Sequence, residues 1–146
     1  MSLYDKVYKI LIGKYIPSNN YIKLNNINKL IHSTKLKCNK QTYTYYSEKI
    51  KELFEEKYNI IDEISCYEFY SNLKNNEIYD LHGIYGYQVD DFLDAIFDYN
   101  IFNKKFKFNI ITGNGNVIKP KTIKYLKFFD INFEVSNGII KINKFT

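Results

Sequence analysis

The chain has 146 residues, of which 45% are hydrophobic and 25% charged, which is the size and balance of one folded domain with a small appendage. No apolar run approaches the roughly 18 residues that span a bilayer, and two cysteines without CxxC spacing argue against a disulfide framework or a zinc site, so we expect a cytoplasmic protein. All 21 basic residues are lysine, which excludes arginine clamps on phosphate.

Charge is unevenly distributed along the chain, although the net charge is only +5. Residues 1–46 and residues 104–146 each carry +7, whereas residues 47–78 carry −4 and residues 79–103 carry −5. Two basic blocks on either side of an acidic middle are typical of a surface that binds a polyanion. Solvated surface lysines explain the same pattern equally well, so charge alone leaves nucleic-acid binding open.

The first part of the chain, residues 1–75, has a mainly helical pattern. We expect one helix closed by Pro17, a second over residues 21–32, a third capped by Ser47, and a further helical stretch over residues 60–72. These helices form either a small domain or a layer packed on the sheet that follows. Their role stays open.

Residues 76–146 alternate between strand and helix patterns. The expected elements are a strand over 76–82, an amphipathic helix starting near Val89, a strand over 105–110, a helix with Pro120 in its first position, and two strands joined by the turn Asn137-Gly138. The aspartates of the first helix fall opposite its apolar residues, which predicts an acidic side facing solvent. The order predicts an α/β two-layer sandwich with a four-stranded mixed sheet.

Asp80 and His82 end the first strand of this domain. Side chains two positions apart on a strand share one face, so the carboxylate can orient the imidazole and raise its basicity. Gly83 then allows the backbone to turn sharply. Taken alone, the pair is weak evidence, because a histidine at a strand end is more often a hydrogen-bonded structural residue than a catalytic one.

A glycine loop follows the next strand and consists of Thr112, Gly113, Asn114 and Gly115. Backbone N–H groups between a strand and a helix can approach a phosphate closely. A strand–helix–strand unit of this length makes its two strands parallel, and their carboxyl ends then lie at one edge of the sheet. Asp80, His82 and the glycine loop should therefore converge, with Lys119 and Lys121 close by.

In this order and context, the motifs resemble those of the Smr (small MutS-related) domain family. The family motifs are LDLHG and TGxG, and they stand here as YDLHG (residues 79–83) and TGNG (residues 112–115). The resemblance covers roughly residues 76–146 and implies a four-stranded α/β sandwich similar to the C-terminal domain of translation initiation factor three. Tyr79 replaces the leading aliphatic residue, Asn114 stands where Lys or Arg is frequent, and the loop after Gly115 is short.

Members of that family bind nucleic acid, and several cleave DNA or RNA. The sequence thus predicts an endonuclease acting on RNA or structured DNA, with Asp80 and His82 as its catalytic residues. The expected substrate-binding residues are Gly83, Thr112, Gly113, Asn114, Gly115, Lys119 and Lys121. No metal-ligating set is predicted, but DNA hydrolysis would need an activated water, for which Mg²⁺ held by Asp80 is the candidate.

Two other functions stay open at this point. The lysine blocks, the glycine loop and exposed tyrosines would also suit a nucleic-acid-binding module without catalysis. A protein-interaction domain is the third alternative. No membrane partner is expected, and the sequence leaves the oligomeric state undetermined.

Overall fold

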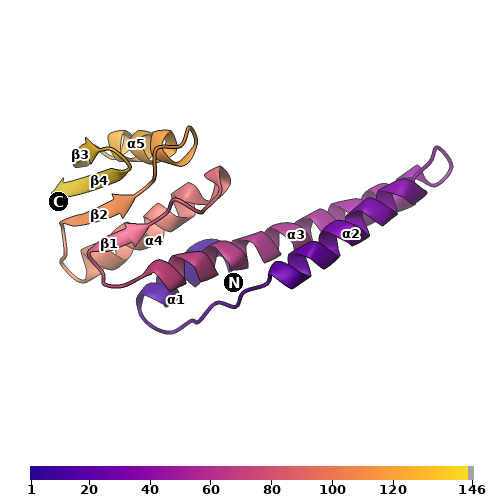
Figure 1. Cartoon of the computed structure of the whole chain (residues 1–146), viewed down its shortest axis with the longest axis horizontal. Helices are drawn as coiled ribbons and strands as arrows, with labels where there is room; N and C mark the ends of the chain where they lie inside the picture. Colours follow the sequence, from indigo (N-terminus) through magenta and orange to yellow (C-terminus); the bar gives the residue numbers. More distant parts are fainter. Residues whose placement is uncertain (145–146) are drawn as a thin grey trace. The chain divides into compact units, whose positions relative to one another are not determined.

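The computed structural model describes residues 1–144 and contains one four-stranded mixed sheet within them (Figure 1). Its strands are β1 (Ile78–Asp80), β2 (Phe108–Ile111), β3 (Asn132–Ser136) and β4 (Ile139–Lys144), arranged in the order β1-β2-β4-β3. β1 runs parallel to β2, whereas β4 is antiparallel to both β2 and β3. The expected α/β fold with a mixed sheet is confirmed.

One face of the sheet is buried beneath helices. α4 (Val89–Phe102) connects β1 to β2, and α5 (Ile118–Phe128) connects β2 to β3. The sheet residues that belong to the buried core are Tyr79, Phe108, Ile110, Ile140 and Ile142. Strand positions between them point to the opposite face, because side chains alternate along a strand. One face of the sheet therefore holds the core, and the other is open.

Contacts divide the chain into two units that do not coincide with the expected boundary at residue 75. The sheet unit comprises Met1–Pro17 together with the chain from Ser65 onward, and the hairpin unit comprises Ser18–Ile64. α1 (Leu3–Leu11) belongs to the sheet unit, because its apolar residues lie in the same hydrophobic core as the apolar residues of α4. The C-terminal end of the third helix joins the same core through Phe69, whose ring contacts the ring of Phe92.

The hairpin unit contains α2 (Tyr21–Lys37) and residues 43–64 of α3 (Tyr43–Asn72). Its core consists of Ile27, Ile31, Leu53, Ile60 and Ile64. The expectation of two separate helices near residues 47–72 is wrong, since α3 is continuous. Ser47 lies inside α3, where its hydroxyl donates to the carbonyl of Thr44 instead of capping a helix. No helix within residues 1–144 has the length and apolar character needed to cross a membrane.

Two details of the expected helices are also corrected. α5 begins at Ile118, so Pro120 is its third residue and not its first. Proline fits there because N–H groups in the first turn have no partner within the helix. α1 ends at Leu11, before Gly13 with φ of 75°, and does not extend to Pro17.

None of the aspartates of α4 is buried, in agreement with the expected acidic side, but two of them also bond to neighbouring helices. Asp94 accepts a 2.6 Å hydrogen bond from the hydroxyl of Tyr125 on α5, and Asp98 accepts one of 2.6 Å from Tyr4 on α1. The bond to Asp98 is the main reason that the pKa of Tyr4 rises to about 12. Burial, followed by the bond to Asp94, raises the pKa of Tyr125. Part of the acidic side of α4 therefore helps to fix the neighbouring helices.

Candidate functional site

β1 and β2 end side by side at one edge of the sheet. Asp80, the last residue of β1, is in register with Ile111, the last residue of β2. The segments that follow also lie close together, because a methyl group added to Gly113 would lie 3.6 Å from the Cβ atom of His82. The predicted convergence of His82 and the glycine loop at one edge is thus confirmed.

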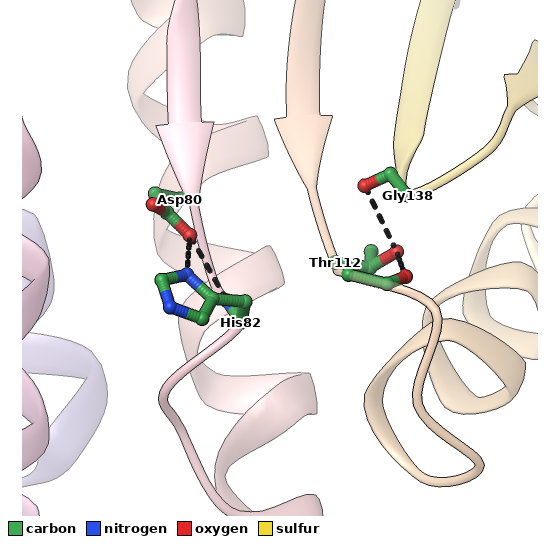
Figure 2. Close-up of polar contacts among 5 residues, drawn as sticks. Asp80, His82, Thr112 and Gly138 are labelled. Atoms are coloured by element: carbon green, nitrogen blue, oxygen red, sulfur yellow. Dashed lines mark hydrogen bonds and ion pairs between the residues drawn. The ribbon is translucent and has the colours of Figure 1, made fainter.

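Asp80 orients His82 through two contacts (Figure 2). Oδ1 of Asp80 accepts a hydrogen bond from the backbone N–H of His82 at 3.1 Å. The same oxygen lies 2.5 Å from the ring atom Nδ1 of His82. The exposed fraction of the His82 side chain is 58%, against 17% for Asp80. In the neutral imidazole, this contact favours the tautomer with its proton on Nδ1, which leaves a lone pair on Nε2. The pair therefore offers an exposed, oriented base.

The glycine loop is held by the turn between β3 and β4. The backbone N–H groups of Thr112 and Gly113 both donate to the carbonyl of Gly138, at 2.8 and 3.1 Å. The buried hydroxyl of Thr112 donates to the carbonyl of Gly113 at 2.9 Å and also lies 3.4 Å from the carbonyl oxygen of Gly138, the contact drawn in Figure 2. These groups were expected to contact substrate, but the structure gives them partners within the protein. Their role here is to shape the loop.

The exposed end of the glycine loop has unused donors. Asn114 and Gly115 are exposed, and no hydrogen bond from their backbone N–H groups is found within residues 1–144. The loop leads directly into α5, whose N-terminal end favours negative charge. Asn114 and Gly115 are therefore the loop positions best suited to contact an anion.

Gly113 and Gly138 must both be glycine, for different reasons. Gly113 has a φ of 68°, a conformation that L side chains rarely adopt. A methyl group on Gly138 would lie 2.8 Å from the Cα atom of Gly113, which is backbone and cannot simply rotate away. Sequence reasoning identified Gly138 only as a turn residue, because its contact with the glycine loop depends on the pairing of β2 with β4.

We expect Gly138→Ala to destabilise the sheet unit by about 1–3 kcal/mol, the usual cost of forcing extra volume into a close contact. Gly115→Ala is the matched control, because it has no positive φ and no atom lies within 4 Å of the added methyl group. Urea unfolding of both variants, followed by circular dichroism, measures the difference. Equal urea midpoints for the two variants would show that a methyl group on Gly138 fits beside Gly113 without a clash.

Lys119 and Lys121 lie in different places. Nζ of Lys119 donates to Oδ1 of Asn114 at 3.3 Å, so Lys119 lies at the glycine loop. Lys121 lies beside Gly86, in a groove that it shares with Asp90 and other residues of α4 and α5. Residues two apart on a helix are separated by about 200° around its axis, which is why the two lysines diverge.

Gly83 directly follows His82 and is exposed. No atom lies within 4 Å of the place that a Cβ atom would occupy at this residue.

Within residues 1–144, no group of three or more His, Cys, Asp or Glu side chains is placed to hold a metal ion. No protein-family model matches the chain, and no curated protein and no solved structure is significantly similar to it. The interpretation of the site therefore depends on its own residues, above all on the contact between Asp80 and His82.

Proposed function

We propose that the C-terminal part of the sheet unit, from residue 76 onward, is an Smr-like domain that binds nucleic acid and cleaves its phosphodiester bonds, with RNA as the substrate that the geometry suits best. The observation that carries this proposal is the exposed imidazole of His82, oriented by Asp80 beside the glycine loop. A single oriented base is sufficient to begin RNA cleavage, because RNA carries its own nucleophile, the 2′-hydroxyl.

In this mechanism, Nε2 of His82 accepts the proton of the 2′-hydroxyl. The 2′-oxygen attacks the adjacent phosphorus, the bond to the 5′-oxygen breaks, and the departing oxygen takes a proton from water. The hydroxide that this leaves takes the proton held on Nε2, which returns His82 to its neutral form. The products are a 2′,3′-cyclic phosphate and a free 5′-hydroxyl. Asp80 stabilises the positive charge that the imidazole gains, and general base catalysis of this kind contributes about 10²–10⁴-fold.

Phosphate binding is assigned to the exposed end of the glycine loop. The backbone N–H groups of Asn114 and Gly115 would donate to the non-bridging oxygens, and Lys119 would add a positive charge. In RNA cleavage these groups also stabilise the charge that develops on the phosphate in the transition state. A nucleic-acid-binding module without catalysis would use the same groups, so cleavage itself has to be tested.

The direct test incubates the purified protein with end-labelled single-stranded RNA, duplex RNA and branched DNA, each with Mg²⁺ and with a chelator. We expect RNA cleavage that persists in the chelator and leaves 2′,3′-cyclic phosphate ends. Cleavage of DNA alone, and only with Mg²⁺, would contradict the RNA mechanism and favour Asp80 as a metal ligand. Salt-dependent binding without any cleavage would favour the non-catalytic module.

The two lysines give a sharper test of where phosphate lies. Lys119→Ala should weaken nucleic-acid binding and lower the slope of log affinity against log salt concentration by about one unit, as expected for one lost phosphate contact. Lys121→Ala is the matched control two residues away and should change the slope little, because Lys121 lies in the groove with Asp90. Titrations by fluorescence anisotropy at several salt concentrations measure both slopes. A larger effect for Lys121 would place the phosphate at that groove instead.

A further inference from the structure

The face of the sheet opposite the helices is exposed and continues directly from the catalytic pair. On β1, side chains alternate, so Ile78 and Asp80 lie on this open face while Tyr79 lies in the core. Figure 2 shows Asp80 and His82 on the near side of the sheet, with α4 behind it. The exposed fractions of Ile78 and Ile139 are 42% and 46%. Two β-branched apolar residues thus face solvent beside the candidate site.

Strand register arranges the open face in two rows. Asp80, Ile111 and Ile139 are in register across β1, β2 and β4 and form the row nearest His82. Ile78, Asn109 and Lys141 are in register in the next row. We call the five residues other than Asp80 the sheet platform. Because neighbouring strands lie about 4.8 Å apart, three strands offer a surface about 10 Å across, which is wide enough for one nucleobase.

The chemistry of the sheet platform suits a base better than a phosphate or a second helix. Three isoleucines provide a flat apolar surface for the face of an aromatic ring. Asn109 and Lys141 add an amide and an ammonium group in the second row, where the polar edge of a base or a neighbouring phosphate could be contacted. Ile111 of the platform is in register with Asp80, so a base on the platform would belong to a nucleotide next to the phosphate at His82.

We propose that the sheet platform binds one unpaired nucleobase of single-stranded RNA, adjacent to the phosphate on which His82 acts. This inference rests on the proposed function and narrows its substrate to single strands. Bases in a duplex are stacked and paired, so they cannot lie flat on a sheet, whereas the bases of single strands are free to do so.

The experiment measures binding separately from cleavage. The ligand is a single-stranded RNA with 2′-O-methyl groups throughout, which cannot be cleaved through the 2′-oxygen, and its matched versions carry one abasic nucleotide at successive positions. The variant is Ile78→Ser combined with Ile139→Ser. Ile101→Ser is the control, since Ile101 is 52% exposed but lies on α4, away from the open face.

For the wild-type protein, we expect one abasic position to weaken binding about tenfold, which is the scale of one lost base contact. The double variant should bind the intact strand about tenfold more weakly and should no longer respond to that abasic position, while Ile101→Ser should behave as wild type. Loss of the response, and not only of affinity, separates a base contact from a general loss of structure.

The outcomes distinguish this inference from the proposed function. Base-dependent binding without cleavage of natural RNA would leave the sheet platform standing and overturn the catalytic role of His82. Cleavage that is unchanged in the double variant, or wild-type binding that is indifferent to every abasic position, would overturn the sheet platform alone. Equal affinity of the wild-type protein for duplex and single strands would also overturn it, and would favour a protein partner for the open face.

Discussion

Replacing His82 with Ala is expected to lower the rate of RNA cleavage by about a hundredfold or more, because it removes the only imidazole at the carboxyl edge of the sheet within the described residues. Binding of RNA should be largely retained, since the glycine loop and Lys119 remain. The measurement is the single-turnover cleavage rate at saturating protein, with the dissociation constant determined separately. This separation distinguishes a loss of chemistry from a loss of affinity.

The fold of the His82→Ala protein should survive. The imidazole is 58% exposed and its one polar partner among the described side chains is Asp80, so its removal leaves no cavity in the core. The urea midpoint should therefore stay close to that of the wild-type protein. A folded variant that cleaves at the wild-type rate would show that His82 is not the catalytic base and would make the non-catalytic module the better interpretation.

Asp80→Asn refines the same test. An amide oxygen could still accept the hydrogen bond from Nδ1, but the negative charge that stabilises the imidazolium would be lost. If Asp80 only orients His82, this variant should retain more activity than His82→Ala, and the chelator should not abolish wild-type cleavage. If Asp80 holds a metal ion, the two variants should be similarly impaired, and the chelator should abolish cleavage.

The parts of this structure that could be predicted from sequence are those decided by local pattern and by general topology. Alternating residues predicted β2, the Asn-Gly turn predicted the β3–β4 hairpin, and helical spacing predicted α4. The convergence of His82 and the glycine loop followed because a strand–helix–strand unit makes neighbouring parallel strands. These inferences needed no knowledge of which distant residues touch.

The parts that could not be predicted depend on distant contacts. Gly138 lies 25 residues beyond Gly113, and only the register of β2 with β4 brings them together. The sheet platform depends on the same register across three strands. In the helical part, Ser47 has the character of an N-cap, but α3 begins four residues earlier, at Tyr43, and the hydroxyl of Ser47 donates to the carbonyl of Thr44 within the helix. Residue preference at a helix start is only a weak guide to where the helix begins.

The size of Tyr79 is explained by its packing. It stands where the Smr motif has an aliphatic residue, and it is fully buried between the rings of Phe69 and Phe108. Its hydroxyl donates to the carbonyl of Asn76 at 2.9 Å and accepts from the side chain of Asn100 at 3.0 Å. The larger ring thus fills space between β1, α3 and β2, and its hydroxyl has two partners in the core.

Tyr79→Ala is therefore expected to destabilise the protein by about 3–5 kcal/mol, the usual cost of emptying a large aromatic site. Tyr79→Phe is the matched control: it keeps the ring and should cost only about 1 kcal/mol, because Asn100 retains its bond to the carbonyl of Ile96 at 2.7 Å. Urea unfolding measures both. If Tyr79→Phe proved as harmful as Tyr79→Ala, the hydroxyl and not the ring would be what stabilises β1. Because Asp80 follows Tyr79 directly, a loosened β1 in the alanine variant should also reduce cleavage, whereas the phenylalanine variant should cleave at nearly the wild-type rate.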